Sequence, residues 1–304
     1  MPIEDIIRRD VELKPLTTMK TGGPASYFAE PGSEDEILEL LKFAEDKGLE
    51  VFILGNGSNV IADDNGYKGL IIKLGSNMSD IKAEPDPEDD GYMLITAEAG
   101  CLLSKFGNTA AGAGLEGAEF SCGIPGSVGG AVFMNAGAYG RDISDIAVSV
   151  RYIEDGEVKT IQVNKEMFGY RTSYFAHEGR IVTGFTARLK KGDPEAINAL
   201  VKELRDKRTS SQPLTVPSCG STFKRPEGYF AGKLIQDSGL KGFSLDDSGA
   251  QVSPKHAGFV VNNGGTAGSA DIRRLIKYIQ DKVYEDSGVK LMCEVRFLGG
   301  EGEE

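Results

Sequence analysis

The sequence predicts an α+β fold with two domains. Its 304 residues, 40% of them hydrophobic, are enough for two separate hydrophobic cores. The first half contains mostly strand patterns, and the last third has helix and strand patterns of its own. We expect the first domain to span residues 1–195, in two subdomains of about 1–70 and 71–195. The second domain would then span residues 196–304, with the last few residues returning to the first domain.

The first subdomain begins with a strand at residues 27–30 and a helix after it. Ser33-Glu34-Asp35-Glu36 forms a capping-box pattern, and Gly48 is typical of a helix end. An apolar strand at residues 51–54 then leads directly into a polar glycine turn, Gly55-Asn56-Gly57-Ser58-Asn59. Strand, helix and strand followed by such a turn resemble a βαβ beginning.

The rest of the first domain reads as a sheet with short helices. Asp155-Gly156 is a hairpin signal, and an acidic, proline-rich tip lies at residues 83–91. We expect a helix at residues 102–113 and strands at residues 70–74, 92–97, 148–154, 158–163 and 180–189.

The second domain has its own periodic patterns. Asp193-Pro194 opens a helix. We expect further helices at residues 231–238 and from a Ser269 cap to Gly288, and a strand at residues 259–261. Residues 290–298 alternate as one strand, which places Glu294 on the less apolar face.

Composition excludes several classes of function. A net charge of −12 argues against a general nucleic-acid binder, and no apolar run is long enough to span a membrane. The four cysteines are scattered and form no C-x-x-C pair, which favours reduced thiols in the cytoplasm. With only two histidines, a histidine-based metal site or a Ser/His/Asp triad is not expected, and we predict no metal.

The glycine-rich stretch from residue 121 to residue 140 is the strongest candidate site. Glycine frees the backbone and lets another group approach closely, and successive bare amides form a concave anion site suited to a pyrophosphate. The stretch matches neither the dinucleotide fingerprint nor a Walker loop. A surface loop without a ligand, and a plain turn at residues 55–59, remain the alternative interpretations.

Three later places carry polar groups in unusual company. Arg171 lies among aromatic residues, where a guanidinium could bind a carboxylate; packing against tyrosine is the alternative. Ser221 and Lys224 could offer a hydroxyl and a cation at a tight turn, or simply form a polar turn. Glu294 could be a functional carboxyl or belong to a solvated face.

Taken in order, these segments resemble the UDP-N-acetylenolpyruvoylglucosamine reductases, over nearly the whole chain. The matching blocks are Thr18-Met19-Lys20-Thr21-Gly22-Gly23, residues 55–59, Gly123-Ile124-Pro125-Gly126-Ser127-Val128-Gly129-Gly130, Asn135-Ala136-Gly137-Ala138-Tyr139-Gly140, Tyr170-Arg171 and Gly220-Ser221-Thr222-Phe223-Lys224. Thr17 stands where the family often has Asn. No long insertion precedes Ser221, which resembles the short-loop (type II) subclass that lacks a tyrosine-bearing loop over the substrate.

The resemblance implies an FAD-binding domain of the vanillyl-alcohol-oxidase (PCMH) type and a smaller substrate-binding domain. FAD would be reduced by NADPH, and reduced flavin would pass hydride to C3 of UDP-N-acetylglucosamine enolpyruvate while C2 receives a proton, in peptidoglycan precursor synthesis. The implied cofactor-binding residues are Gly55, Asn56, Gly57, Ser58, Asn59, Gly123, Ile124, Pro125, Gly126, Ser127, Gly129, Gly130, Asn135 and Gly137.

By the same resemblance, Arg171 polarises the substrate carboxylate, Ser221 donates the proton and Glu294 stabilises the enol-like intermediate. A desolvated carboxyl can hold a proton, so we hypothesise that Glu294 is protonated. Polar residues near the matching blocks are candidates for the UDP-sugar: Tyr170, Lys224, Arg208, Gln212, Gln251 and His256. We expect a cytoplasmic monomer or weak oligomer that binds no nucleic acid and does not insert into a membrane.

Two other flavoproteins would fit the same residues. A different flavoenzyme on this fold would react with oxygen and would not need Arg171 or Ser221. A flavin or nucleotide-sugar sensor would bind flavin without turning over NADPH. A serine hydrolase is disfavoured because no nucleophile elbow has a histidine placed to serve it.

Overall fold

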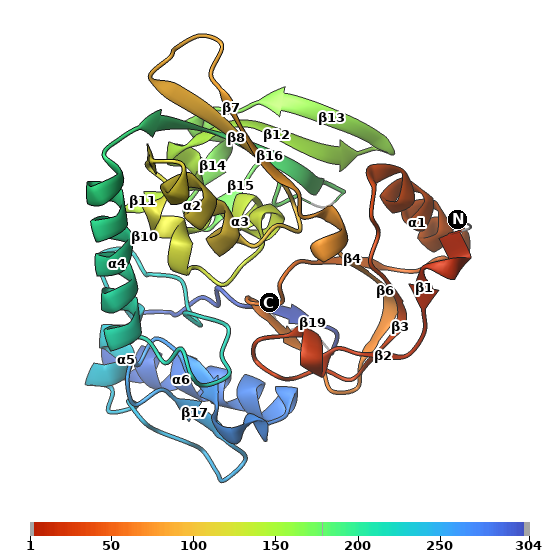
Figure 1. The fold of residues 1–304 in the computed structure, drawn as a ribbon. Coiled ribbons are helices and arrows are strands. Elements are labelled where there is room, and N and C mark those ends of the chain that lie inside the picture. Colours follow the sequence, from red (N-terminus) through yellow and green to blue (C-terminus); the bar gives the residue numbers. More distant parts are fainter. Residues whose placement is uncertain (1–2, 178, 301–304) are drawn as a thin grey trace. The chain divides into compact units, whose positions relative to one another are not determined.

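The computed structural model describes residues 3–177 and 179–300 (Figure 1). Backbone contacts divide the chain into two compact units. Unit 1 comprises residues 1–7, 29–56 and 71–208, and unit 2 comprises residues 8–28, 57–70 and 209–304. The boundary therefore passes between Asn56 and Gly57, inside the glycine turn singled out in the sequence.

Unit 1 is built on a six-stranded antiparallel sheet with the order β13-β12-β16-β8-β7, in which β9 also pairs with β16. Asp155 and Gly156, at φ +55° and +75°, form the turn of the β12–β13 hairpin. The strands are β7 (Ile81–Pro85), β8 (Tyr92–Glu98), β9 (Leu115–Glu116), β12 (Ala147–Glu154), β13 (Glu157–Gln162) and β16 (Ile181–Lys191).

Helices α2 (Leu103–Gly112) and α3 (Val128–Met134) pack against this sheet, with Phe106, Val128 and Phe185 fully buried between them (Figure 1). Unit 1 also holds α1 (Glu34–Lys47), β4 (Val51–Leu54), most of α4 (Pro194–Ser211) and two hairpins. The hairpins are β10 (Gly137–Ala138) with β11 (Arg141–Asp142), and β14 (Phe168–Gly169) with β15 (Thr172–Ser173).

A five-stranded sheet has the order β1-β3-β6-β4, with β2 paired to β3. Its strands are β1 (Ile7–Arg8), β2 (Val11–Glu12), β3 (Pro24–Ala29), β4 and β6 (Tyr67–Lys73). Short 3-10 helices occur at Ile3–Asp5, Lys14–Leu16, Ser76–Met78, Glu119–Gly123, Ile143–Asp145, Lys165–Met167 and Asn263–Gly265.

Unit 2 has a core around α6 (Ser269–Ser287), whose residues Ile272, Leu275 and Ile279 are fully buried. Around it lie α5 (Ala231–Asp237), the antiparallel pair β17 (Ala250–Val252) and β18 (Val260–Asn262), and the parallel pair β5 (Val60–Ala62) and β19 (Arg296–Leu298). Unit 2 therefore combines the last third of the chain with segments from its first seventy residues.

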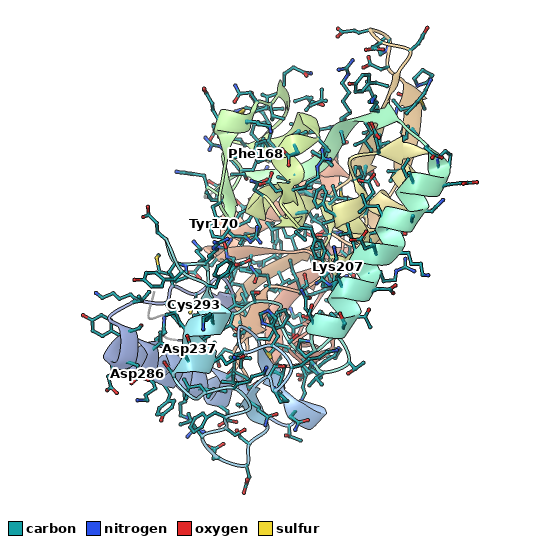
Figure 2. All side chains as sticks on the ribbon, turned by 90° about the vertical axis from the view of Figure 1, so that its left-hand side faces the viewer. Phe168, Tyr170, Lys207, Asp237, Asp286 and Cys293 are labelled. Carbon is teal, nitrogen blue, oxygen red and sulfur yellow. The ribbon has the colours of Figure 1, made fainter. Side chains whose placement is uncertain are left out.

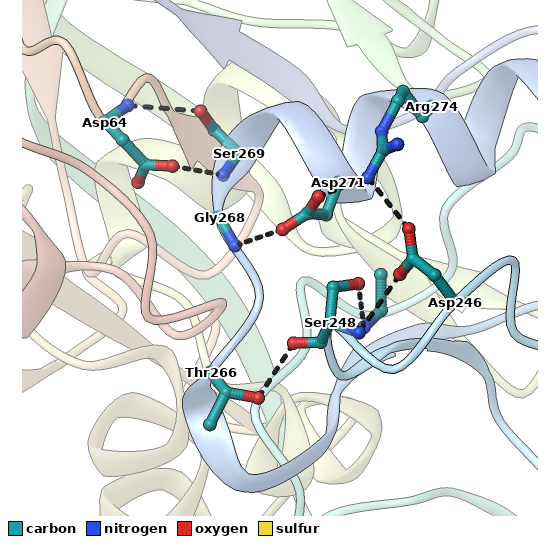
Figure 3. A network of polar contacts seen from close by, with 9 residues as sticks. Asp64, Asp246, Ser248, Thr266, Gly268, Ser269, Asp271 and Arg274 are labelled. Carbon is teal, nitrogen blue, oxygen red and sulfur yellow. Dashed lines mark hydrogen bonds and ion pairs between the residues drawn. The ribbon is translucent and has the colours of Figure 1, made fainter.

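The start of α6 is held by a network of polar contacts (Figure 3). Asp64 accepts from the Ser269 backbone N–H at 2.6 Å, and its own N–H donates to Ser269 Oγ at 3.1 Å. Asp271 accepts from the Gly268 N–H, and Arg274 pairs with Asp246. The helix cap is therefore supplied by a residue 205 positions earlier in the chain.

The structure corrects three of the predicted elements. The N-cap of α6 is Gly268 and not Ser269. Only Arg296–Leu298 of the predicted strand at 290–298 pairs with another strand, although the burial alternates as expected: Leu291 is buried and Met292 is 65% exposed. The sequence analysis predicts no helix in the glycine-rich stretch, but α3 begins there at Val128 with Ser127 as its N-cap.

The predicted division at residue 195 stays a prediction, because backbone contacts do not report which unit binds which ligand. The expected return of the last few residues involves residues 301–304, which lie outside the described part of the chain. Within residues 3–177 and 179–300, no helix combines the length and apolar character needed to cross a bilayer.

Candidate active site

Two turns of unit 1 that the sequence singled out lie against each other. Asn56 Nδ2 donates to the Pro125 carbonyl at 2.8 Å. A Cβ on Gly55 would lie 2.3 Å from Ser127 Oγ, so only glycine fits where the end of β4 meets the N-cap of α3. The contact brings two predicted flavin-binding segments, about 70 residues apart, to one place in unit 1.

The backbone N–H groups at the start of α3 differ in whether they donate to protein acceptors. Those of Val128 and Gly129 donate to the Cys101 and Ala99 carbonyls, and that of Gly130 donates to Ser127 Oγ at 3.3 Å. Among the described residues, the Gly126 and Ser127 amides donate to no protein acceptor. These two amides are the ones that can receive an anion, while Gly129 allows the helix to approach Ala99.

Arg208 reaches this place from the last turn of α4. Its Cδ lies 3.1 Å from the position of a Cβ on Gly123. Its Nε is buried and has no hydrogen-bond partner in the described structure, and desolvation lowers the pKa of the guanidinium. A buried cation with an unused donor beside a glycine turn fits an anionic group such as the diphosphate of FAD.

Arg171 occupies the turn of the β14–β15 hairpin in unit 1. Its φ is +56°, a left-handed conformation that is costly for a residue with a side chain. The guanidinium lies 5.1 Å from the centre of the Tyr170 ring, and Tyr170 is 55% exposed. Figure 2 shows Phe168 and Tyr170 along this hairpin. Such a strained backbone conformation persists only where neighbouring residues hold the strained residue in place.

Two predicted cofactor residues provide that support. Asn135 caps α3 at φ +44°, and its Nδ2 donates to the Gly169 carbonyl at 3.0 Å. The Gly137 carbonyl accepts from Arg171 Nη2 at 3.2 Å. Ser173 Oγ adds a third link by donating to the Phe133 carbonyl. The observed contacts of Asn135 and Gly137 therefore position the Arg171 hairpin.

Ser221 and Glu294 lie on paired segments of unit 2. Phe223 and Cys293 form an antiparallel bridge, and the Glu294 N–H donates to the Thr222 carbonyl at 2.8 Å. Thr222 is buried, and its Oγ1 accepts from the Val260 N–H. Ser221 is exposed and Glu294 half-buried, and the backbone segments that carry them are paired within unit 2.

The second half of the first glycine turn also serves this pair. Asn59 Nδ2 donates to the Glu294 carbonyl at 3.1 Å, and the Asn59 carbonyl accepts from the Arg296 N–H. Gly57 has φ +63°, and a Cβ there would lie 2.1 Å from the Leu16 carbonyl oxygen. In the described contacts, Gly57 and Asn59 therefore act on protein groups of unit 2.

The predicted substrate residues differ in their surroundings. Gln212 carries a buried Oε1 with no partner in the described structure, whereas Gln251 Nε2 donates to the Gly242 carbonyl. His256 Nδ1 accepts from the Gly258 N–H, and burial lowers the pKa of the imidazole. The Lys224 N–H donates to the Met292 carbonyl, which places Lys224 on the segment paired with Glu294.

Sequence reasoning missed the role of Thr18. Its Oγ1 donates to the Ser218 carbonyl at 2.7 Å and its N–H to the Gly57 carbonyl at 3.0 Å. It thereby links the turn before Ser221 to the Gly57 turn. The only signal was its place in a matching block, because a threonine between Thr17 and Met19 has no distinctive pattern.

Comparisons with known proteins agree with this geometry. Residues 25–162 match a family model described as an FAD binding domain. Residues 212–298 match the UDP-N-acetylenolpyruvoylglucosamine reductase C-terminal domain. The chain is 46% identical to the UDP-N-acetylenolpyruvoylglucosamine reductase of Agathobacter rectalis, over 96% of this chain and 93% of that protein. The corresponding reductase of Alkaliphilus oremlandii is 42% identical over 98% and 95%.

A solved structure extends the likeness to three dimensions. The crystal structure of UDP-N-acetylenolpyruvylglucosamine reductase from Thermus caldophilus matches with a TM-score of 0.80 and 32% identity, covering 96% of this chain and 100% of that one. The fold and site thus define a flavin-dependent oxidoreductase with an FAD-binding domain of the vanillyl-alcohol-oxidase type, as the sequence predicted. More particularly, the chain belongs to the UDP-N-acetylenolpyruvoylglucosamine reductase family. This confirms the predicted FAD cofactor, NADPH as reductant and the reaction in peptidoglycan precursor synthesis.

Proposed function

We propose that Arg171, Ser221 and Glu294 divide the chemistry of reducing UDP-N-acetylglucosamine enolpyruvate to UDP-N-acetylmuramate. FAD, once reduced by NADPH, supplies the hydride that reaches C3 of the enolpyruvyl group. Negative charge then develops at C2 and on the adjoining carboxylate, and a proton must reach C2. The chain therefore needs a cation for the carboxylate and a neutral donor for the carbon.

The observation that carries this proposal is the backbone pairing of the Ser221 and Glu294 segments. The Glu294 N–H donates to the Thr222 carbonyl, and Asn59 holds the Glu294 carbonyl from the other side. We assign the proton transfer to the Ser221 hydroxyl and the stabilisation of the enol-like intermediate to Glu294. A protonated Glu294 would serve best because it can donate a hydrogen bond to the developing oxyanion.

Arg171 takes the substrate carboxylate in this scheme. A guanidinium forms two parallel hydrogen bonds to a carboxylate, and the strained turn at φ +56° presents this side chain from the end of a rigid hairpin. Contacts from Gly137 and Asn135 stabilise that hairpin. Tyr170, next to it, remains our candidate for a substrate contact.

The flavin diphosphate would lie against the Gly126 and Ser127 amides. The resemblance made Arg208 a candidate for the UDP-sugar, but because it lies beside the glycine turn at Gly123, we now propose that it neutralises the charge of the flavin diphosphate. Support comes from the unused amides, from the buried Nε of Arg208 and from the close packing at Gly55 and Gly123. Ile124 and Pro125 complete this turn. Lys224 is our first candidate for the substrate diphosphate, followed by Gln212, Gln251 and His256.

We further propose that the protein is a cytoplasmic monomer or weak oligomer of the short-loop (type II) subclass. All four cysteines are free, which suits a reducing compartment. Cys219 is buried, donates its thiol to the Val60 carbonyl, and has its pKa raised to about 12 by desolvation. Such a thiol is inert packing material.

Replacing Ser221 by alanine tests the central assignment. Stopped-flow absorbance separates two half-reactions: flavin reduction by NADPH, and flavin oxidation by the enolpyruvyl substrate. We expect the first to be unchanged and the second to slow about 10²- to 10⁴-fold, the usual contribution of a general acid. Ser244→Ala, a half-buried serine in another loop of the same unit, is the control. Equal rates of flavin oxidation in Ser221→Ala and wild type would refute the role of Ser221.

A further inference from the structure

The hairpin that carries Arg171 is held from α3 and also from the six-stranded sheet of unit 1. On the α3 side, Asn135 donates to the hairpin backbone. On the sheet side, the chain leaves the hairpin at Tyr174, three residues after Arg171. Both backbone groups of Tyr174 are bonded: its N–H donates to the Met167 carbonyl at 2.7 Å, and its carbonyl accepts from Arg180 Nη1 at 2.7 Å. Arg180 therefore holds the point at which the chain leaves the hairpin.

Arg180 makes three different contacts through one planar guanidinium. Besides the bond to the Tyr174 carbonyl, its Nε donates to Glu154, the last residue of β12. Its guanidinium carbon lies 3.7 Å from the centre of the Tyr174 ring. The side chains of Arg180 and Glu154 are each only 19% exposed. Because Arg180 directly precedes β16, this one side chain links the end of the hairpin to two strands of the sheet.

Aromatic rings pack between the hairpin and the sheet. The fully buried Phe175 has its ring 5.3 Å from that of Tyr152 in β12 and 6.5 Å from that of Phe168 in β14. Tyr174 meets Phe175 edge-on at 5.4 Å. Such tilted and edge-to-face pairs are favourable arrangements of aromatic side chains. Arg180 stacks on Tyr174, the most exposed of these four residues, and so completes the cluster at the surface.

The position of the Arg171 side chain depends on this support. Its strained conformation at φ +56° persists only while neighbouring residues hold the turn. The strand between the turn and Tyr174 is β15, which contains only Thr172–Ser173. A displacement at Tyr174 is therefore transmitted to Arg171 through two residues. A displacement of about 1 Å at a reacting group can slow a reaction about 100-fold.

We infer that Arg180 is a positioning residue for the reduction of the enolpyruvyl substrate: by holding Tyr174, it directs the Arg171 guanidinium toward the substrate carboxylate. This inference rests on the proposed function, which assigns that carboxylate to Arg171. Arginine suits the task because its fork of N–H donors bonds a carbonyl and a carboxylate at once, while its flat face stacks on a ring. Arg180 acts through Arg171 and contacts neither substrate nor flavin in this scheme.

Stopped-flow absorbance of the FAD-loaded Arg180→Met enzyme tests the inference. We expect flavin oxidation by saturating enolpyruvyl substrate to slow about 10- to 100-fold, while flavin reduction by NADPH keeps its wild-type rate. Glu154 retains the Lys159 ammonium at 3.0 Å, so the substitution leaves no unpaired carboxylate and the variant should fold. Arg180→Lys, which keeps a cationic donor, should lose less. Equal slowing of both half-reactions overturns the inference, because the flavin itself would then be disturbed.

Arg188→Met is the matched control. Arg188 lies on β16, pairs with Asp86 and has its guanidinium carbon 4.0 Å from the centre of the Tyr92 ring. It repeats the chemistry of Arg180, but its partners lie in the β7–β8 hairpin. The Asp86 side chain is 5% exposed, so losing Arg188 should destabilise the enzyme at least as much. We expect wild-type rates in both half-reactions. Flavin oxidation slowed as much as in Arg180→Met overturns the inference.

A double-mutant cycle separates this inference from the proposed function. If Arg180 acts through Arg171, adding Arg180→Met to Arg171→Met should slow flavin oxidation no further. Additive losses overturn the inference, since Arg180 would then act independently. Slower oxidation in Arg171→Met with a wild-type rate in Arg180→Met overturns the inference and leaves the proposed function intact. A wild-type rate in Arg171→Met refutes the proposed role of Arg171, and this inference with it.

Discussion

The turn at Gly123–Gly130 and the turn at Gly57–Asn59 look alike in the sequence, yet the structure uses them differently. The first leaves the Gly126 and Ser127 amides without protein acceptors and lies beside the buried Arg208. At the second, two groups contact protein: a Cβ on Gly57 would meet the Leu16 carbonyl oxygen, and Asn59 Nδ2 donates to the Glu294 carbonyl. A glycine indicates that another group comes close to the backbone, but it does not indicate whether that group is a ligand or another part of the chain.

The sharpest test of this difference compares two glycines with the same backbone conformation. Gly57 and Gly48 have φ +63° and +61°, but a Cβ would meet the Leu16 oxygen only at Gly57, while nothing lies within 4 Å at Gly48. We expect Gly57→Ala to lower the free energy of unfolding by about 2–5 kcal/mol through strain and overpacking. Gly48→Ala should cost only about 1–2 kcal/mol.

Chemical denaturation of both variants with FAD bound measures these losses. Equal losses at the two positions would mean that the packing around Leu16 is not what requires glycine at residue 57. The two turns would then no longer be distinguished by their structural demands.

A second test addresses the turn that we assign to the ligand. Arg208→Met removes a buried cation that has an unused donor. We expect the dissociation constant for FAD to rise about 10- to 100-fold, because a hydrogen bond to a charged group contributes about 1.5–3 kcal/mol. Without FAD, the same variant should melt at a higher temperature, because an uncompensated buried charge is gone.

Fluorescence titration of the apoprotein with FAD and a thermal melt of the apoprotein give the two values. Lys207→Met, on the same turn of α4 (Figure 2), is the control for loss of charge. A lower melting temperature of the Arg208→Met apoprotein, together with unchanged FAD affinity, would make Arg208 a structural residue.

The smallest expected effect separates two asparagines of one turn. Asn56 donates to Pro125 in the flavin-side turn, and Asn59 donates to Glu294. We expect Asn56→Ala to weaken FAD binding about fivefold, the equivalent of one hydrogen bond, with kcat at saturating FAD unchanged. Asn59→Ala should lower kcat about fivefold or more with FAD affinity unchanged. If Asn56→Ala lowered kcat and Asn59→Ala weakened FAD binding, our assignment of Asn56 to the flavin side and of Asn59 to Glu294 would be wrong.

Local signals predicted the elements whose ends depend on neighbouring residues. Ser33 caps α1 through the Glu36 N–H, and Gly48 ends it in a left-handed conformation, as the pattern indicated. Pro194 opens α4. These elements follow from hydrogen bonds and φ values within a few residues, so a single sequence is sufficient to locate them.

Elements with distant partners were predicted less well. Ser269 reads as a cap, but it is the first residue of α6, where its N–H donates to the Asp64 carboxylate and its Oγ accepts from the Asp64 N–H; the N-cap is Gly268. Residues 290–298 alternate like a strand, but only Arg296–Leu298 finds a partner, in β5. The sequence predicts no helix at the start of α3, because its glycines have low helix propensity and the contacts with Ala99 and Cys101 that hold them are not local.

The sequence by itself determined the α+β class, the family and the identity of the polar residues available for chemistry, because composition, periodicity and ordered blocks are properties of a single chain. The tertiary structure decided which atoms meet. In the structure, the Asn59 side chain bonds the Glu294 carbonyl, and Asn135 and Gly137 bond the hairpin that carries Arg171. Among the described residues, the Gly126 and Ser127 amides have no protein acceptor. Those outcomes depend on backbone groups that every residue carries, and their partners are selected by packing between segments up to 235 residues apart.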